Sequence, residues 1–209
     1  KYQINDRRPY PDSQVNSIPE IIDFYFKNKL GSGHLIFLST NVYNMEIAMQ
    51  YYGLTLTRSY CDIAQLLPVF HALDNGVGSV MFRNFPIVDF VKPEPGTSYN
   101  YLHTAVSIST TAQFQFKMND YYHKKLGFLV TNGFSHYRII RSALMENDRK
   151  RGKFLYGQIY SRSFKYSSSL LDKAYHILFF ICYYLHINLP YDAALRFRTW
   201  IRRYFPNFR

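Results

Sequence analysis

Cysteine, tryptophan and acidic side chains are scarce in this chain of 209 residues. It contains two cysteines and one tryptophan, and its 14 acidic residues are outnumbered by 25 Lys and Arg. The two cysteines, Cys61 and Cys182, cannot make a disulfide framework, and neither has a second cysteine at metal-ligand spacing. We therefore expect a reducing compartment, no zinc module and no structural disulfide.

Long apolar runs are also absent. The longest, Ile177 to Leu185, is far shorter than the roughly 20 residues that a membrane-spanning helix needs. No signal peptide is recognisable. The sequence therefore predicts an intracellular, soluble protein without a transmembrane segment. Because residue 1 is a lysine and not a methionine, any function encoded upstream would be invisible in this sequence.

Aromatic residues are abundant. The chain has 20 Tyr and 18 Phe, and hydrophobic residues make up 47% of it. A chain of this length and composition can bury a sizeable core, which argues against general disorder. No linker or internal repeat divides it, so we expect an extended lead-in over residues 1–17 and a single helical domain over residues 18–209.

The formal charge of +11 is concentrated in two stretches, 138–153 and 196–209. One interpretation is a surface that binds phosphate groups. The other is that these residues belong to solvated helix faces and a tail. The sequence leaves both interpretations open.

Hydrophobic periodicity predicts helices through most of the chain. Ser17 is a suitable N-cap for a helix that begins at Ile18, and Asn44 for a long helix that reaches about Leu73. A second apolar helix is predicted from Val80 to Val91, and a short hairpin within residues 97–116. Further helices are predicted from Met118 with a break at Gly127, and over 134–144, 153–160, 170–187 and 192–205. The predicted fold class is all-α with one small hairpin.

Catalytic and metal-binding motifs were sought and not found. The chain has no Gly-rich phosphate loop and no His-Glu-x-x-His helix. Ser135 begins a stretch similar to a nucleophile elbow, but the closing glycine is missing. Asp120 and His123 share a helix face, where a surface hydrogen bond explains them better than acid–base chemistry. We therefore expect no enzyme, no metal and no cofactor.

Two stretches resemble one known family. The first is Ile63-Ala64-Gln65-Leu66-Leu67-Pro68-Val69-Phe70-His71-Ala72-Leu73, followed by Met81-Phe82-Arg83-Asn84-Phe85. The second is Tyr191-Asp192-Ala193-Ala194-Leu195-Arg196-Phe197, with Pro206-Asn207-Phe208-Arg209 after it. Both are similar to segments of nuclear hormone receptor ligand-binding domains of the divergent nematode type. Phe154 to Tyr160, followed by Ser167 to Ser169, resembles the eighth helix and the start of the ninth.

The resemblance implies a three-layer helical sandwich that can hold a lipophilic small molecule in an apolar pocket. The alternative is an orphan pocket that side chains fill. It also implies a groove in which the helix of a coregulator docks. The residues that it assigns to the pocket are Met49, Tyr52, Gly53, Leu56, Ile87, Phe90 and Val91. Those that it assigns to the groove are Gln65, Phe70, Phe82 and Arg83.

The chain departs from the family pattern at functional positions. Gln65 stands where the family has a lysine that clamps the coactivator, and no activation helix follows Phe208. Arginines and Trp200 replace leucines on the tenth helix, which affects the usual homodimer or heterodimer surface. The resemblance therefore implies a nuclear regulator of transcription that is repressor-like, a dimer partner or degenerate. DNA would be bound only by an upstream module outside this chain.

Two other functions compete with the receptor interpretation. One is a basic helical protein that binds nucleic acid or a membrane surface. The other is an enzyme whose fold gathers His123, His136 and acidic groups around one cleft.

Overall fold

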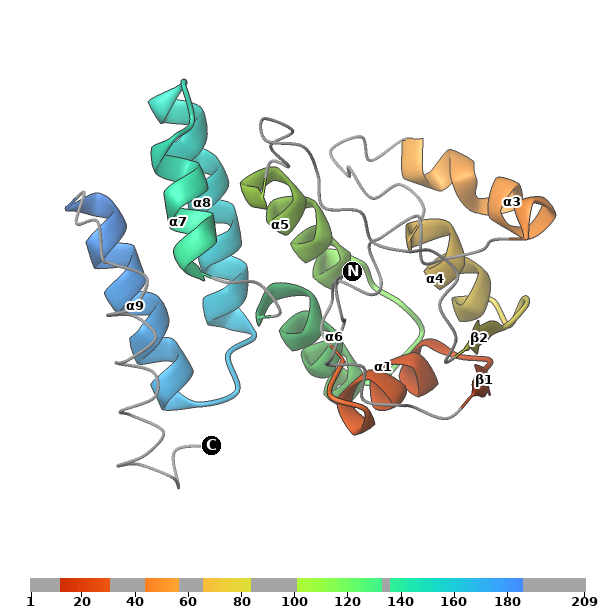
Figure 1. Ribbon diagram of the computed structural model, residues 1–209. Coiled ribbons are helices and arrows are strands. Elements are labelled where there is room, and N and C mark those ends of the chain that lie inside the picture. Colours follow the sequence, from red (N-terminus) through yellow and green to blue (C-terminus); the bar gives the residue numbers. More distant parts are fainter. Residues whose placement is uncertain (1–11, 31–43, 57–65, 84–100, 133–135, 186–209) are drawn as a thin grey trace, which may run out of the picture. The chain divides into compact units, whose positions relative to one another are not determined.

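The chain folds into two compact units. The computed structural model describes residues 12–30, 44–56, 66–83, 101–132 and 136–185 (Figure 1). Unit 1 comprises residues 1–59, 64–94 and 116–118, and unit 2 comprises residues 60–63, 95–115 and 119–209. The described residues form eight α-helices and one two-stranded sheet. The prediction of a mostly helical protein is therefore confirmed.

Helix α1 (Ile18–Lys27) opens unit 1 and starts where the sequence predicts. The backbone amide of Glu20 donates to the hydroxyl of Ser17, and the Glu20 carboxylate accepts from the backbone amide of Asn16 at 2.9 Å. The arrangement is similar to a capping box, except that Glu20 reaches the amide of the residue before the N-cap, and it satisfies amide groups that have no partner within the helix. The helix buries its apolar side, including Ile18, Ile21 and Tyr25.

The only sheet among the described residues joins two segments far apart in sequence. Strand β1 (Ser13–Val15) pairs antiparallel with β2 (Val80–Phe82), so that Gln14 lies opposite Met81. The helix predicted from Val80 is therefore wrong over its first three residues. The reason lies in the preceding turn, where Gly76 and Gly78 both adopt positive φ angles and direct the chain into an extended path.

The long helix predicted from 44 to 73 is also wrong. Helix α3 (Met45–Leu56) starts at the predicted cap, where the Asn44 side chain accepts from the Glu46 amide at 3.0 Å. Helix α4 (Leu66–Asp74), however, packs against α3. Two segments of one straight helix cannot pack against each other, so the apolar stripe that the sequence shows is divided between two helices.

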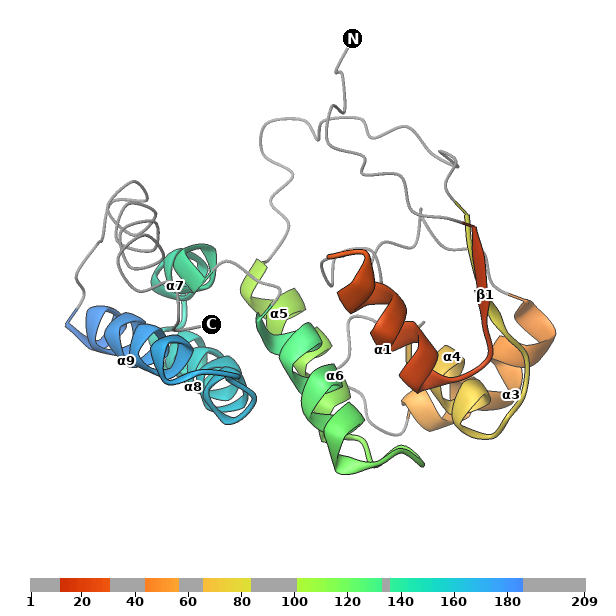
Figure 2. The ribbon, with the colours of Figure 1, turned by 90° about the horizontal axis from the view of Figure 1, so that it is seen from below.

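Unit 2 is built around one central helix, α8 (Arg149–Lys165). It packs against α5 (Tyr101–Thr110), α6 (Asp120–Asn132), α7 (His136–Leu144) and α9 (Leu170–Tyr184). A short 3-10 helix, η2 (Thr111–Gln113), continues α5. Figure 2 shows α8 and α9 side by side along their lengths. Ser169 caps α9 as predicted, because its hydroxyl accepts from the Asp172 amide at 3.1 Å.

The hairpin predicted within 97–116 is wrong, because α5 occupies residues 101–110. Its β-branched residues favour a strand locally. Leu102, Ala105 and Ile108 nevertheless recur at steps of three and are fully buried. Leu102 and Ala105 share a core cluster of unit 2 with side chains from α7, α8 and α9, among them Ile139, Tyr156, Ile159 and Phe179. Burial of this helical stripe outweighs the local preference.

Arg162 ties α8 to the end of α5. It is 9% exposed, and its guanidinium donates to the Val106 carbonyl at 3.0 Å and to the Ser109 hydroxyl at 2.7 Å. The side chain of Gln158 accepts a further bond at 3.0 Å. The buried cation thus lies at the C-terminal end of α5, where the helix dipole is negative. Burial lowers the pKa of Arg162, and the acceptors bond its two terminal nitrogens.

Gly127 allows α6 and α8 to approach each other, and α6 runs through it without the predicted break. A Cβ at this position would lie within 2.4 Å of three ring carbons of Tyr166, whose hydroxyl donates to the Ala112 carbonyl at 2.9 Å. We expect Gly127→Ala to lower the free energy of unfolding by about 1–3 kcal/mol, because the clash forces the ring or the helix to move. Chemical denaturation of the whole chain measures this.

Gly157 provides the matched control, because it lies on α8 and an added Cβ there would meet nothing within 4 Å. Gly157→Ala should raise stability by about 0.5–1 kcal/mol, since alanine is the better helix former. Combining Gly127→Ala with Tyr166→Ala should cost less than the sum of the two changes. Equal effects of the two glycine changes would contradict the close packing at Gly127.

Candidate functional site

The residues assigned to a pocket are not brought together in the described part of the chain. Met49 is 59% exposed, and Gly53 is exposed with open space where a Cβ would be. Tyr52 and Leu56 lie on α3, but their side chains fall outside the described residues. Ile87, Phe90 and Val91 lie outside them altogether. Met49 and Gly53 therefore face solvent and do not line an internal cavity.

The residues assigned to a partner groove have structural contacts within unit 1. Phe70 is 1% exposed, and its ring contacts Phe116 edge to face. The ring of Phe82 stacks on that of Phe24, with centroids 3.9 Å apart. Arg83 forms an ion pair with Asp12 at 2.8 Å, in which both side chains are about half exposed. Gln65 lies outside the described residues. Phe70 and Phe82 are thus anchored in apolar packing, and Arg83 lies at the surface.

The described residues contain no group of three His, Cys, Asp or Glu side chains that could hold a metal ion. Asp120 lies at the exposed start of α6, with His123 one turn further along. The side chain of His136 lies outside the described residues. No helix in the described segments is long and apolar enough to cross a bilayer.

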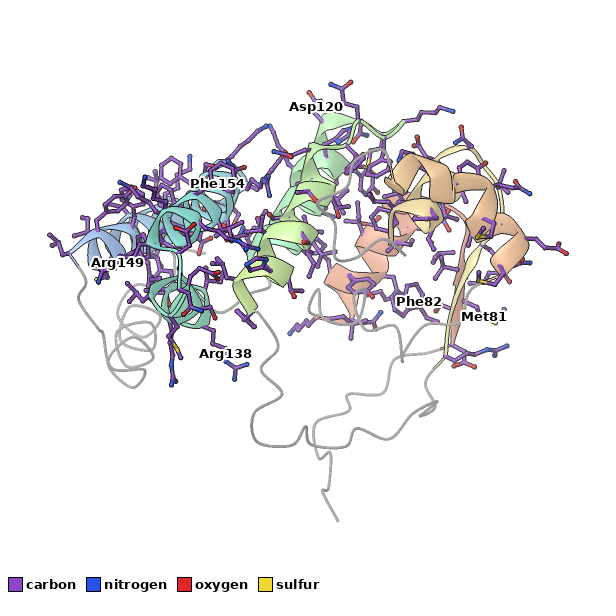
Figure 3. All side chains as sticks on the ribbon, turned by 90° about the horizontal axis from the view of Figure 1, so that it is seen from above. Met81, Phe82, Asp120, Arg138, Arg149 and Phe154 are labelled. Carbon is purple, nitrogen blue, oxygen red and sulfur yellow. The ribbon has the colours of Figure 1, made fainter. Side chains whose placement is uncertain are left out.

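The basic residues of the stretch 138–153 are all exposed. They lie on α7 and in the first turns of α8, and we call this set of residues the α7–α8 basic face. Figure 3 labels Arg138 on α7 and Arg149 on α8, and the Arg138 side chain extends away from its helix. Its six members, all exposed, are Arg138, Arg141, Arg149, Lys150, Arg151 and Lys153. The second basic stretch, 196–209, lies outside the described residues.

The acidic side chains nearest in sequence are occupied elsewhere. Asp148 caps α8, where its carboxylate accepts from the backbone amides of Lys150 and Arg151 at 2.8 and 3.2 Å. The Glu146 carboxylate lies 3.5 Å from the Nε2 atom of His103 on α5 and is largely buried. None of the six basic side chains forms an ion pair with a carboxylate in the described part of the chain. Within the described residues, no ion pair therefore neutralises a cation of this face.

The position of three of these cations opposes helix stability. Arg149, Lys150 and Arg151 occupy the first turn of α8, and that turn has no acidic residue. The N-terminus of a helix carries a partial positive charge, so each cation there costs a few tenths of a kcal/mol up to about 1 kcal/mol. Local stability therefore does not explain why the sequence has three consecutive cations at this point.

Exposed aromatic side chains border the basic face, and the sequence analysis missed them. Phe154 follows Lys153 on α8 and is 64% exposed (Figure 3). The ammonium group of Lys153 lies 5.1 Å from the ring centre of Tyr184, which is 43% exposed. The sequence predicts a helix over 153–160 but does not show that Phe154 faces outward, because periodicity alone does not distinguish the inner from the outer face of an aromatic-rich helix.

Comparisons with known proteins give no relative. No protein-family model matches the chain, and neither a curated protein nor a solved structure is significantly similar to it.

His176 is the buried titratable group with the largest predicted effect on stability at mildly acidic pH. It is 2% exposed, and its Nε2 atom lies 3.0 Å from the side-chain oxygen of Asn132. Burial lowers the pKa of His176 from 6.5 to about 4, and the nearby Asp172 only partly offsets this. The ring is therefore neutral at pH 7 and serves to join α9 to α6.

This pKa shift predicts a loss of stability in acid. Between pH 6.5 and 4 the unfolded chain binds a proton at His176 that the folded chain does not, so stability is complete above pH 6.5 and falls as the pH approaches 4. The loss should reach about 3 kcal/mol at most. His176→Gln should reduce this loss, as measured by urea denaturation at several pH values. The same pH profile in both proteins would contradict a titrating His176.

Proposed function

We propose that this chain is a non-catalytic regulatory domain similar to the ligand-binding domains of nuclear hormone receptors, and that it acts on transcription in the nucleus. The observation that carries the proposal is the run from Ile63 to Leu73 followed by Met81-Phe82. The proposal concerns regulation through a partner, because the likeness lies in segments that build the coregulator side of such domains.

The packing of the motif residues supports this proposal. Phe70 and Leu73, which carry the first part of the motif, are buried on α4. Phe82 of the second part stacks on Phe24 of α1, in the same unit. Further along the chain, α8 is followed by the Ser169 cap and α9, which agrees with the likeness to the eighth and ninth helices. The apolar positions of the pattern therefore have structural roles in this chain.

Two findings argue against a complete three-layer sandwich, so the arrangement of layers gives the proposal no further support. Strand β2 stands at the start of the second predicted helix, and α3 packs against α4 where one long helix was predicted. The proposal therefore rests on the sequence motif and on the helical fold class.

The exposure of Met49 and Gly53 counts against an enclosed hormone site, because both residues face solvent where the likeness places the wall of the pocket. We accordingly propose an orphan, constitutive form of the domain. Native mass spectrometry of the purified chain should give the bare mass of the polypeptide. A stoichiometric lipophilic adduct, with a higher unfolding temperature than the stripped protein, would contradict the filled pocket.

A reporter assay tests the regulatory role itself. The chain, fused to a DNA-binding domain without regulatory activity of its own, should change transcription from a reporter without added ligand. Leu67→Asp is the matched control, because it places a carboxylate in the core at a residue 1% exposed and should unfold unit 1 and abolish the effect. An unchanged reporter at equal expression of the wild-type fusion would contradict the proposal.

A further inference from the structure

We infer that the α7–α8 basic face binds the phosphodiester backbone of a nucleic acid. The inference does not depend on the receptor likeness, since it uses only unit 2. Six exposed cations lie within sixteen residues, and four of them are arginines. The planar guanidinium group donates two parallel hydrogen bonds to one phosphate, which makes arginine well suited to this partner.

The distribution of the cations favours a polymer with repeated charges over a small anion. Two of the six side chains, Arg138 and Arg141, lie on α7, and the other four lie in the first two turns of α8. A single phosphate or carboxylate group is too small to contact all six side chains on both helices. A nucleic acid has one phosphate per nucleotide and can therefore contact several of them at once.

The interior packing of the same helices argues against insertion into a membrane. The apolar sides of α7 and α8 are buried in the core of unit 2 through Ile139, Tyr156 and Ile159. Helices that lie in a membrane surface need such a side free to enter the lipid. Among the described side chains from 138 to 165, the exposed large apolar ones are Met145, in the turn between the two helices, and Phe154 on α8. Acidic vesicles are nevertheless the necessary counter-test, because α9 also exposes Ile177 and Ile181.

Phe154 provides a way to distinguish binding to a single strand from binding to a duplex. It follows Lys153 directly and is 64% exposed, so an unpaired base can stack on its ring. The bases of a duplex are already stacked and cannot do so. The backbone contact is common to both forms, and the effect of Phe154 separates them.

The unfavourable position of Arg149, Lys150 and Arg151 provides the decisive test. Replacing all three by glutamine keeps a good helix former at each position and removes cations from the positive end of α8. The triple variant should therefore unfold at the same or a higher temperature than the wild type. A structural role for the three cations predicts the opposite, so stability and binding should change in opposite directions.

Binding would be measured by fluorescence anisotropy with labelled mixed-sequence oligonucleotides, single-stranded and duplex, over a series of salt concentrations. The whole chain should bind with an affinity that falls steeply as salt rises. The triple variant should bind about tenfold more weakly at 0.1 M salt, and its slope of log affinity against log salt should fall by about 0.9 per lost duplex contact. A control with the same loss of charge, Lys27→Gln, Lys29→Gln and Lys124→Gln, should leave the slope unchanged; these three lysines are exposed and lie outside the face.

Phe154→Ala assigns the form of the nucleic acid. Weaker single-strand binding with unchanged duplex binding identifies a single-strand surface, and no effect on either identifies a duplex surface. The inference is overturned if the wild type does not bind, or if both triple variants lose affinity equally. It is also overturned if the α8 triple variant loses binding to phosphatidylserine vesicles but not to nucleic acid.

Discussion

The burial of one side of α8 is the constraint on which unit 2 depends. This helix contacts α5, α6, α7 and α9, and Tyr156 and Ile159 on its inner side are almost fully buried. Because that side must face the core, the helix has only one orientation in which it can pack. The residues on its other side, including Lys150 and Phe154, are then necessarily exposed. The surface chemistry of this unit is thus a consequence of its packing.

The buried and the exposed cations of α8 differ in their hydrogen-bond partners. The terminal nitrogens of Arg162 donate to the Val106 carbonyl and the Ser109 hydroxyl of α5 and to the Gln158 side chain of α8 itself. Within the described residues no side chain accepts a hydrogen bond from the arginines of the first turn, and Asp148 is engaged with backbone amides. A buried charge without partners would be very costly, whereas an exposed one is hydrated by water. The exposed cations remain available to an external anion, and this difference underlies the nucleic-acid inference.

Sequence signals correctly predicted where helices begin, because the interactions involved join residues only a few positions apart. Ser17, Asn44 and Ser169 cap the helices that they were expected to cap, because an N-cap acts on amides only two or three residues away. The turn after α4 likewise depends on nearby residues, since Gly76 there adopts a positive φ angle. Predictions failed where distant segments compete for the same residues. Val80 to Phe82 pairs with β1, more than sixty residues earlier, and Phe82 then stacks on Phe24.

The sequence by itself determined that the chain is mainly helical, where several helices begin, and that positive charge gathers between residues 138 and 153. Composition and caps are sufficient for this, since each depends on residues close together in the chain. Only the tertiary structure decided that α3 and α4 are separate helices, that α5 is helical despite its β-branched residues, and that Phe154 is exposed. Periodicity reveals that a helix has an apolar side, but the burial of each residue depends on which other helices pack against it.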